Sequence, residues 1–152
     1  ALNREVHSRH SEAFPEVFRA NPSDEEVTEA FGAVIDAPSG CWFVASEDQT
    51  VIGYLSAEFR EREETWCRTA QRVCYLGGIV VDPTFRRKGV ARELVAALKR
   101  EAAKRDTAQI ELDVWEFNDD AQKAFADLGF EPLMQRMRLK LNIGGNRAKI
   151  IP

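Results

Sequence analysis

Cysteine and histidine are scarce in this chain of 152 residues. The three cysteines, Cys41, Cys67 and Cys74, form no Cys-x-x-Cys pair, so neither a disulfide framework nor a zinc cluster is expected, and reduced thiols are predicted. The two histidines, His7 and His10, would supply two metal ligands without a nearby third, which makes a poor site. The sequence therefore predicts no bound metal.

Long apolar runs and a strong excess of one charge are also missing. No apolar run approaches the ~20 residues that span a bilayer, and the first ten residues lack the apolar core of a signal peptide. The 21 basic and 25 acidic residues give a net charge of −4, which is not typical of a protein that wraps nucleic acid. We therefore predict a cytoplasmic protein with neither a membrane nor nucleic acid as a partner.

The composition that remains is that of an ordinary globular domain. Apolar residues make up 44% of the chain and charged residues 30%, so a disordered or low-complexity chain is excluded. The length fits one domain with its own core, and no internal repeat or linker is visible. We predict one domain over residues 1–141 and assign no structure to the tail 142–152, which is glycine-rich at its start.

Apolar periodicity predicts the order helix, helix, hairpin, strand, helix, strand, helix, strand. Ser23 and Glu26 form a capping box at the start of the second helix, and Gly129 is expected to end the last one. The charged stretch 60–72 is predicted to be a solvated loop or an extended hairpin tip. The predicted strands are 41–45, 51–57, 73–81, 110–114 and 130–141, and the predicted helices cover 2–14, 24–35, 90–104 and 121–128.

This order predicts an α/β fold. Strand–helix–strand units imply parallel pairing, whereas the hairpin adds antiparallel strands, so one mixed sheet with helices on both faces is expected. The pair Gly77-Gly78 lies inside the most apolar strand, where glycine indicates a bulge or the close approach of another group.

The junction after that strand carries the chemistry. A short basic turn with Arg86, Arg87 and Lys88 leads to Gly89, and a helix begins there. The first N–H groups of a helix have no internal acceptor and lie in a positive potential. Glycine lets a ligand approach the backbone closely. The sequence therefore predicts a cradle for a pyrophosphate, although a basic turn that caps a surface helix has the same pattern.

Two motifs resemble one family. Val81-Asp82-Pro83, followed by Arg86-x-x-Gly89-x-Ala91, resembles the acetyl-CoA-binding signature of the GNAT superfamily of N-acetyltransferases. The later run resembles its second signature, with Val114-Trp115-Glu116-Phe117-Asn118 and then Ala121, Phe125 and Leu128-Gly129-Phe130. The resemblance covers roughly residues 1–141 in the order of elements. It implies a mostly antiparallel sheet with one parallel pair splayed apart at Gly78 and Val114, and an enzyme that uses acetyl-CoA as co-substrate.

The resemblance also assigns roles to individual residues. It implies that Ile79 and Val81 offer backbone groups to the pantetheine arm, that the turn holds the pyrophosphate mainly through N–H groups, and that Asn118 contacts the cofactor arm. The expected acceptor is the primary amine of a small molecule or a peptide. The residues expected to bind acetyl-CoA are Ile79, Val80, Val81, Arg86, Arg87, Lys88, Gly89, Val90, Ala91, Asn118 and Phe125.

Three positions depart from the family pattern. Phe125 stands where many members carry a tyrosine that can protonate the leaving thiolate. Gly77-Gly78 stands where many carry an acidic or polar residue, which removes one usual base. The family also usually opens with a strand before its first helix, and here no strand is predicted before that helix. The hairpin strand 41–45 is then expected to be a free sheet edge, which predicts a homodimer, with a contribution from Ile150-Ile151.

Four carboxylates are candidates for the catalytic base: Glu58, Glu111, Asp113 and Glu116. Strand alternation puts Glu111 and Asp113 on one face and Ile110 and Leu112 on the other. Glu58 is the preferred base because it ends a strand beside the expected mouth of the acceptor site. Trp42, Trp66 and Trp115 could line an acceptor pocket, but packing is the simpler role for each.

Two other functions use part of the same pattern. A non-catalytic module that senses acyl-CoA would keep the cradle and would explain the absent tyrosine. A nucleotide- or phosphate-binding domain would fit the glycine turn but not Asn118 or the run from Leu128 to Phe130, and the chain has no Walker or dinucleotide glycine motif.

Overall fold

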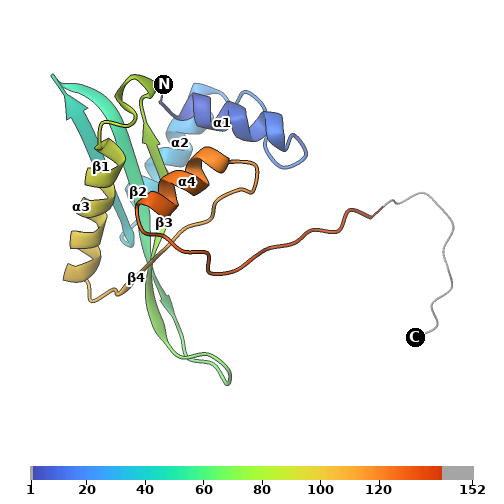
Figure 1. The fold of residues 1–152 in the computed structure, drawn as a ribbon, viewed down its shortest axis with the longest axis vertical. Helices are drawn as coiled ribbons and strands as arrows, with labels where there is room; N and C mark the ends of the chain where they lie inside the picture. The colour runs from blue at the N-terminus through green and yellow to red at the C-terminus, as the bar shows by residue number, and fades with distance from the viewer. Residues whose placement is uncertain (1, 142–152) are drawn as a thin grey trace, which may run out of the picture.

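One four-stranded sheet organises the computed structural model, which describes residues 2–141 (Figure 1). The strands lie in the order β1-β2-β3-β4, and the predicted mixed α/β fold is confirmed. The elements, in chain order, are α1 (Leu2–Ala13), α2 (Asp24–Ile35), β1 (Gly40–Glu47), β2 (Thr50–Arg62), β3 (Gln71–Val81), the 3₁₀ turn η1 (Pro83–Phe85), α3 (Val90–Lys104), β4 (Gln109–Glu111) and α4 (Asp119–Asp127).

The sheet is mostly antiparallel. β1 pairs antiparallel with β2 and β2 with β3, whereas β4 runs parallel to β3. β2 and β3 continue past the body of the sheet as a two-stranded arm, so of the two alternatives predicted for the charged stretch 60–72 the extended hairpin tip is the one observed (Figure 1). Within the described residues no strand precedes α1, and β1 lies at one edge of the sheet.

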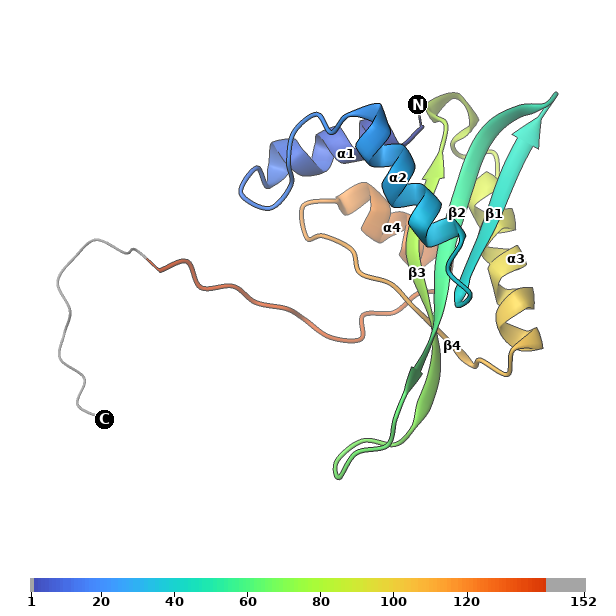
Figure 2. The same cartoon turned by 180° about the vertical axis from the view of Figure 1, so that it is seen from behind.

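Helices lie on both faces of the sheet (Figures 1 and 2). α3 covers one face, α2 covers the other, and α1 and α4 lie beside β3. The core is the layer between α3 and the sheet, because side chains of alternate strand residues meet the apolar side of the helix there. Its fully buried members are Leu55, Cys74, Val95 and Leu98.

Local signals explain where the helices begin and end. Ser23 Oγ accepts from the N–H of Glu26 and the Glu26 carboxylate accepts from the N–H of Ser23, so the predicted capping box is present. Gly129 has a φ of +90° directly after the last turn of α4, a conformation that disfavours residues with a Cβ. Both histidines serve α1: His7 bonds to the carbonyl of Arg19 and His10 to that of Val6.

Glycine in β3 marks a bulge. Ser56 pairs with Gly78 and Ala57 pairs with Leu76, so Gly77 is the extra residue. A Cβ at either glycine would make only ordinary contact with Ser56 Oγ, so neither position excludes a side chain by crowding. The bulge turns the strand at the level where its pairing with β4 ends.

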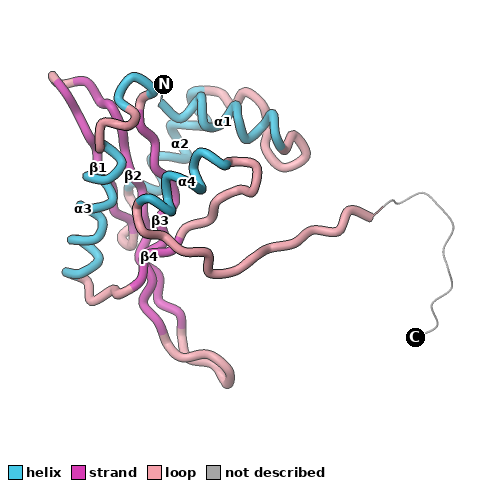
Figure 3. Tube along the Cα trace, viewed as in Figure 1, coloured by secondary structure: helices cyan, strands magenta, loops and turns pink. Residues whose placement is uncertain are grey.

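Three predicted strands differ from the structure by three or more residues. β2 continues to Arg62 instead of ending at residue 57, so Glu58 lies within the strand and not at its end. β4 ends at Glu111 instead of Val114, because parallel pairing stops at Tyr75 and Glu111. The predicted strand 130–141 is wrong: within the described residues this segment forms no strand and extends away from the sheet (Figure 3). Its apolar alternation is real, but it has no neighbouring strand to pair with. The tail 142–152, including Ile150-Ile151, lies outside the described residues.

Among the described helices none has the length and apolarity to cross a bilayer. The same residues contain no cluster of three or more histidine, cysteine, aspartate or glutamate side chains that could hold a metal ion.

Stability at alkaline pH is expected to depend on Cys74. Burial raises the pKa of its thiol from 9.0 to about 12. The unfolded chain therefore releases this proton before the folded chain does, and the stabilisation is complete below pH 9 and decreases as the pH rises toward 12. We expect the free energy of unfolding, measured by urea titration, to fall between pH 8 and pH 10.5.

The matched variants are Cys74→Ala, which removes the buried thiol, and Cys67→Ser, which changes an exposed one. Tyr54 and Tyr75 also have raised pKa values because of burial, so part of the pH slope remains in every variant. The slope should become shallower in Cys74→Ala alone. An equal slope in Cys74→Ala and the unmodified chain would contradict the prediction.

Candidate active site

The turn between β3 and α3 presents a row of free backbone donors. None of the N–H groups of residues 87 to 92 has an acceptor in the described part of the chain, and the first bond of the helix runs from Glu93 to the carbonyl of Gly89. No side chain caps α3. These donors and the helix dipole together form a site for an anion.

Backbone conformation keeps this row open. Gly89 has a φ of +87° and Arg87 a φ of +60°, so the turn enters the left-handed region twice. A Cβ placed on Gly89 would meet nothing within 4 Å. The side-chain position of Gly89 is therefore open, and a glycine there lets a ligand approach the backbone closely. Val90 and Ala91, the first helical residues, contribute two of the donors.

The basic side chains of the turn have different surroundings. Arg86 Nε donates to the carbonyl of Val81 at 3.1 Å, and its guanidinium pairs with Glu5 of α1 at 2.8 Å. Lys88 lies over the ring of Phe85, with 4.7 Å between Nζ and the centroid. Arg86 thus fixes the turn to α1, whereas the side chains of Arg87 and Lys88 are exposed.

β3 has an unpaired edge beside this turn. The N–H of Asp82 bonds to the carbonyl of Ile52 on the β2 side, so by alternation the backbone groups of Ile79 and Val81 point to the opposite edge. β4 pairs with β3 only as far as Tyr75, which leaves this edge without a strand partner in the described structure. Val80 is buried and its backbone points toward β2. The edge is suited to bind an extended amide-containing chain through Ile79.

Asn118 and Phe125 lie on α4. Asn118 Oδ1 accepts from the N–H of Ala121 and caps the helix, and its amide nitrogen has no acceptor among the described residues. This nitrogen is therefore available to a ligand. The half-buried ring of Phe125 packs edge-on against Phe130, with 5.7 Å between the centroids.

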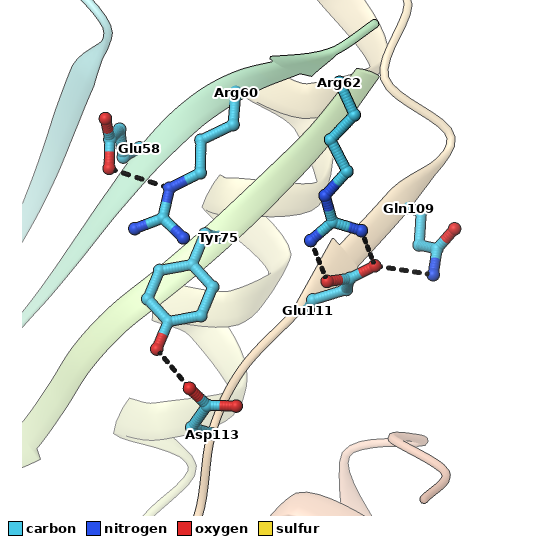
Figure 4. Close-up of polar contacts among 7 residues, drawn as sticks. All are labelled: Glu58, Arg60, Arg62, Tyr75, Gln109, Glu111 and Asp113. Carbon is cyan, nitrogen blue, oxygen red and sulfur yellow. Dashed lines mark hydrogen bonds and ion pairs between the residues drawn. The ribbon is translucent and has the colours of Figure 1, made fainter. Parts of the chain in front are cut away.

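Three of the four candidate carboxylates come together on one face of the sheet (Figure 4). Glu58 of β2 pairs in register with Tyr75 of β3, which pairs in register with Glu111 of β4. Asp113 follows on the same side, and the Tyr75 hydroxyl donates to its Oδ2 at 2.9 Å. We call Glu58, Glu111 and Asp113 the acidic row.

Arginines hold two members of the acidic row. Arg60 Nε donates to Glu58 at 2.9 Å, and the Arg60 guanidinium lies 3.9 Å from the centroid of the Tyr75 ring. Arg62 makes two bonds to Glu111, at 2.9 and 2.6 Å (Figure 4). Glu111 is only 14% exposed and has both oxygens bonded, whereas Asp113 is exposed and accepts only from Tyr75 among the described side chains.

Tyr75 is the residue that the sequence analysis missed. Burial, followed by the bond to Asp113, raises the pKa of its hydroxyl, so it keeps its proton at neutral pH. Strand alternation could have indicated this residue, because a side chain between the buried Cys74 and Leu76 must point to the other face of the sheet, where Glu58 and Asp113 lie.

The remaining candidates lie elsewhere. Glu116 is exposed in the loop before α4, outside the acidic row. Trp42 packs against Phe31 and Tyr54, and Trp66 is 97% exposed at the tip of the arm. Trp115 packs against Phe14 and Phe18 at the end of α1, next to the loop that follows β4.

Comparison with known proteins agrees with this geometry. The profile of the acetyltransferase (GNAT) family matches residues 3–130. Aminoglycoside N(6')-acetyltransferase type 1 of Salmonella typhimurium is 29% identical over 116 residues, which cover 76% of this chain and 79% of the relative.

Solved structures show the same arrangement of elements. A variant of the BH1408 protein from Bacillus halodurans superposes with a TM-score of 0.85 at 25% identity, covering 93% of this chain and 90% of that one. The aminoglycoside N-acetyltransferase AAC(6')-Iy in complex with CoA gives a TM-score of 0.69 at 26% identity, with 90% of each chain covered. The same enzyme with a bisubstrate analogue, CoA-S-monomethyl-acetylneamine, gives 0.68 at 25% identity, covering 91% of this chain and 93% of that one.

The open turn at Gly89, the free edge at Ile79 and the donor on Asn118 lie on the segments that resemble the two family signatures, and the family profile spans all three. This chain belongs to the acetyltransferase (GNAT) family and is an acetyl-CoA-dependent N-acetyltransferase that acts on an amine.

Proposed function

We propose that this enzyme acetylates a primary amine of a small, multiply cationic molecule such as an amino sugar, by direct attack on acetyl-CoA in a ternary complex. The observation that carries the proposal is the acidic row, which lies on an exposed face where pairing between β3 and β4 ends. A carboxylate on that face attracts an ammonium group and can also accept the proton that the amine must lose.

The charge of the acidic row favours a cationic acceptor. Arg60 and Arg62 each pair with one member of the row, whereas the exposed Asp113 has only a neutral hydroxyl donor among the described side chains. Its negative charge is therefore left for an ammonium group. The relatives named for aminoglycoside N-acetylation support the same class of acceptor, which carries several amines on one compact molecule.

Glu58 is the proposed base. A primary amine has a pKa near ~10.4, so only about one molecule in a thousand is neutral at pH 7, and a carboxylate that removes the proton, directly or through water, assists the reaction. The side chain of Glu58 is 44% exposed and is oriented by Arg60 and by the hydroxyl of Ser39 at 3.4 Å. It can therefore meet both solvent and acceptor.

The backbone of the β3 edge would assist the acyl carbon. The Ile79 N–H faces the unpaired edge and would polarise the thioester carbonyl. The departing thiolate is a fair leaving group, since thiol pKa values lie near ~8.5. The reaction therefore does not require a proton donor at position 125, where this chain has Phe125. Because Cys74 is buried and burial also raises the pKa of Cys41, an acyl-cysteine intermediate is not part of the proposal.

Mass spectrometry with a panel of acceptors tests this proposal. The protein is incubated with acetyl-CoA and either an amino sugar with several amines, a monoamine of similar size or a lysine peptide. We expect an acetylated amino sugar, with kcat/KM at least about tenfold above that of the monoamine, because a second ammonium group gains an ion pair worth roughly 1.4 kcal/mol.

The other outcomes contradict separate parts of the proposal. Preferred acetylation of the peptide would overturn the acceptor class but keep the reaction. A protein that binds acetyl-CoA, detected as a higher melting temperature, yet acetylates nothing in the panel would instead favour the sensor module. A trapped acetyl-cysteine on the reaction path would overturn direct attack. A cytoplasmic location and a homodimer through the edge of β1 stay predictions from the sequence.

A further inference from the structure

Tyr75 carries a hydroxyl group from the middle of the sheet onto the acidic row. β3 is paired with β2 on one side and, as far as Tyr75 and Glu111, with β4 on the other, so the backbone at Tyr75 is held from both sides. The hydroxyl lies on the axis of a rigid ring, and only two side-chain torsions separate that ring from the backbone. The position of this hydroxyl is therefore set by the sheet.

Asp113 has no comparable support of its own. It lies two residues past the end of β4, and none of the loop hydrogen bonds in the described chain involves its backbone. Among the described side chains its exposed carboxylate accepts only from the Tyr75 hydroxyl, at 2.9 Å (Figure 4). The orientation of this carboxylate therefore depends on Tyr75.

One guanidinium group joins Tyr75 to the proposed base. Arg60 Nε donates to Glu58 at 2.9 Å, and the same guanidinium lies over the ring of Tyr75, 3.9 Å from its centroid (Figure 4). A cation over the face of an aromatic ring is attracted by the ring quadrupole, so this contact steadies both side chains. Glu58 and Asp113 are thus linked in one chain of contacts through Arg60 and Tyr75.

This chain of contacts spans the width of two strand pairs. Glu58 is on β2 and Asp113 follows β4, so their backbones are two strand spacings apart, about 10 Å. The ring of Tyr75 lies between the two carboxylates (Figure 4). An ion pair extends over no more than about 4 Å, so one ammonium group meets one of the two carboxylates. A molecule with two amines can meet both.

We infer that Tyr75 is a positioning residue for the acceptor: it holds the Asp113 carboxylate at a fixed place relative to Glu58, so that one ammonium group pairs with Asp113 while another amine meets the base. The inference rests on the proposed function and adds to it what selects the reacting amine, namely its separation from a second ammonium group on the same molecule. Tyr75 acts through Asp113 and not on the reacting atoms.

Steady-state kinetics of Tyr75→Phe test this role. The change removes one oxygen atom and keeps the ring beneath Arg60, so the contact of Arg60 with Glu58 should remain. For an amino sugar with several amines we expect KM to rise about three- to tenfold, with kcat changed less than about twofold, because a lost hydrogen bond to a charged group weakens binding by this order. For a monoamine of similar size both constants should stay within about twofold, since it has no second ammonium group for Asp113.

Two further variants show whether Tyr75 acts through Asp113. Asp113→Ala should raise KM for the amino sugar at least as much, and adding Tyr75→Phe to it should change nothing further. Tyr54→Phe is the matched control, because the Tyr54 hydroxyl also donates to a side-chain oxygen, Asn3 Oδ1 at 3.2 Å, away from the acidic row. It should leave both constants unchanged for both acceptors.

The contact itself can be measured without an acceptor. The chain has two tyrosines, so Tyr54→Phe leaves Tyr75 as the only one, and its ionisation is followed by the absorbance of tyrosinate. Burial and the bond to the Asp113 carboxylate raise the pKa of Tyr75, whereas Arg60 and Arg136 lower it. Adding Asp113→Ala should therefore move the titration to lower pH. An unchanged titration would show that the bond is absent in solution and would overturn the inference.

The contrary kinetic results are distinct from one another. If Tyr75→Phe lowers kcat for both acceptors, Tyr75 takes part in the reaction itself, and additive losses in the double variant would give it a contact of its own with the acceptor. An unchanged KM in Tyr75→Phe would show that Asp113 is held without it. Each of these results rejects the positioning role and leaves the proposed function standing. An unmodified protein that acetylates no amine would reject the proposed function and this role with it, whereas the absorbance titration decides the contact separately.

Discussion

Replacing Gly89 with glutamate is expected to remove most of the stabilisation that acetyl-CoA gives to this protein. The Cβ position of Gly89 opens onto free space, and Gly89 lies in the middle of the residues 87–92 whose N–H groups are unpaired. A carboxylate there would occupy that space and repel a pyrophosphate. We expect the affinity for acetyl-CoA to fall by about 100-fold, because a charge repulsion and lost N–H bonds together cost a few kcal/mol.

The measurement is the melting temperature with and without ligand. At a ligand concentration of 100 times the unmodified Kd, binding stabilises by about 2.7 kcal/mol, and a 100-fold weaker Kd leaves about 0.4 kcal/mol of this. For a chain of this size about 1 kcal/mol corresponds to roughly 2–4 °C. A shift of several degrees should therefore shrink to about one.

Gly129→Glu is the matched control. Gly129 has a φ of +90° against +87° for Gly89, and a Cβ would meet nothing within 4 Å at either position. Both variants carry the same backbone strain of about 1–2 kcal/mol, so both should melt earlier without ligand. Only the Gly89 variant should lose the ligand shift, and an equal loss in both would place the diphosphate elsewhere.

Local signals made much of this fold predictable. Capping at Ser23, the stop at Gly129 and the apolar stripe of α3 depend on residues near one another in sequence, and all three are as predicted. The bulge at Gly77 and the free donors after Val81 also follow from local backbone chemistry. Such features need no knowledge of distant neighbours.

Features that depend on a partner strand could not be read in the same way. The alternation in 130–141 is that of a strand, but a strand needs an edge to pair with, and within one chain this segment has none. Similarly, Val114 continues the apolar alternation of Ile110 and Leu112, yet β4 ends at Glu111 because its pairing with β3 stops at Tyr75. Periodicity records which side of a segment is apolar and not where the facing surface comes from.

The acidic row lies between these cases. Alternation correctly separated Glu111 and Asp113 from Ile110 and Leu112. The register that brings Glu58 level with Tyr75 and Glu111 depends on the bulge and on the pairing of three strands, which no single segment specifies. The contacts of Arg60 and Arg62 follow from that register, which explains why the arginines were not singled out.

Glu58→Gln is expected to lower kcat at pH 7 by about 10²- to 10⁴-fold, the range that a positioned base contributes. The amide keeps the size of the side chain. Its oxygen can accept from Arg60 and its NH2 group can donate to the hydroxyl of Ser39, so the local structure should remain. Affinity for acetyl-CoA should be unchanged, since Glu58 is not part of the turn or of the free edge of β3.

Glu61→Gln provides the matched control on the same strand. Glu61 also pairs with an arginine, Arg72, at 3.2 Å. Its side chain lies on the opposite face of β2 from Glu58, in the two-stranded arm of β2 and β3. Its replacement removes the same charge from β2 without touching the acidic row. We expect less than about a twofold change in kcat, because an exposed ion pair contributes little.

The pH profile distinguishes a base from a residue that only positions the acceptor. For an amine with a pKa near ~10.4, the neutral fraction rises about tenfold with each unit by which the pH increases, as long as the pH stays below the pKa. The rate of Glu58→Gln should therefore rise steeply between pH 7 and pH 9 and recover part of the loss, whereas the unmodified enzyme should rise less. A deficit that stays constant across this range, with a raised KM for the amine, would assign Glu58 to acceptor binding. The base would then be sought at Asp113, where Asp113→Asn should show the steep profile instead.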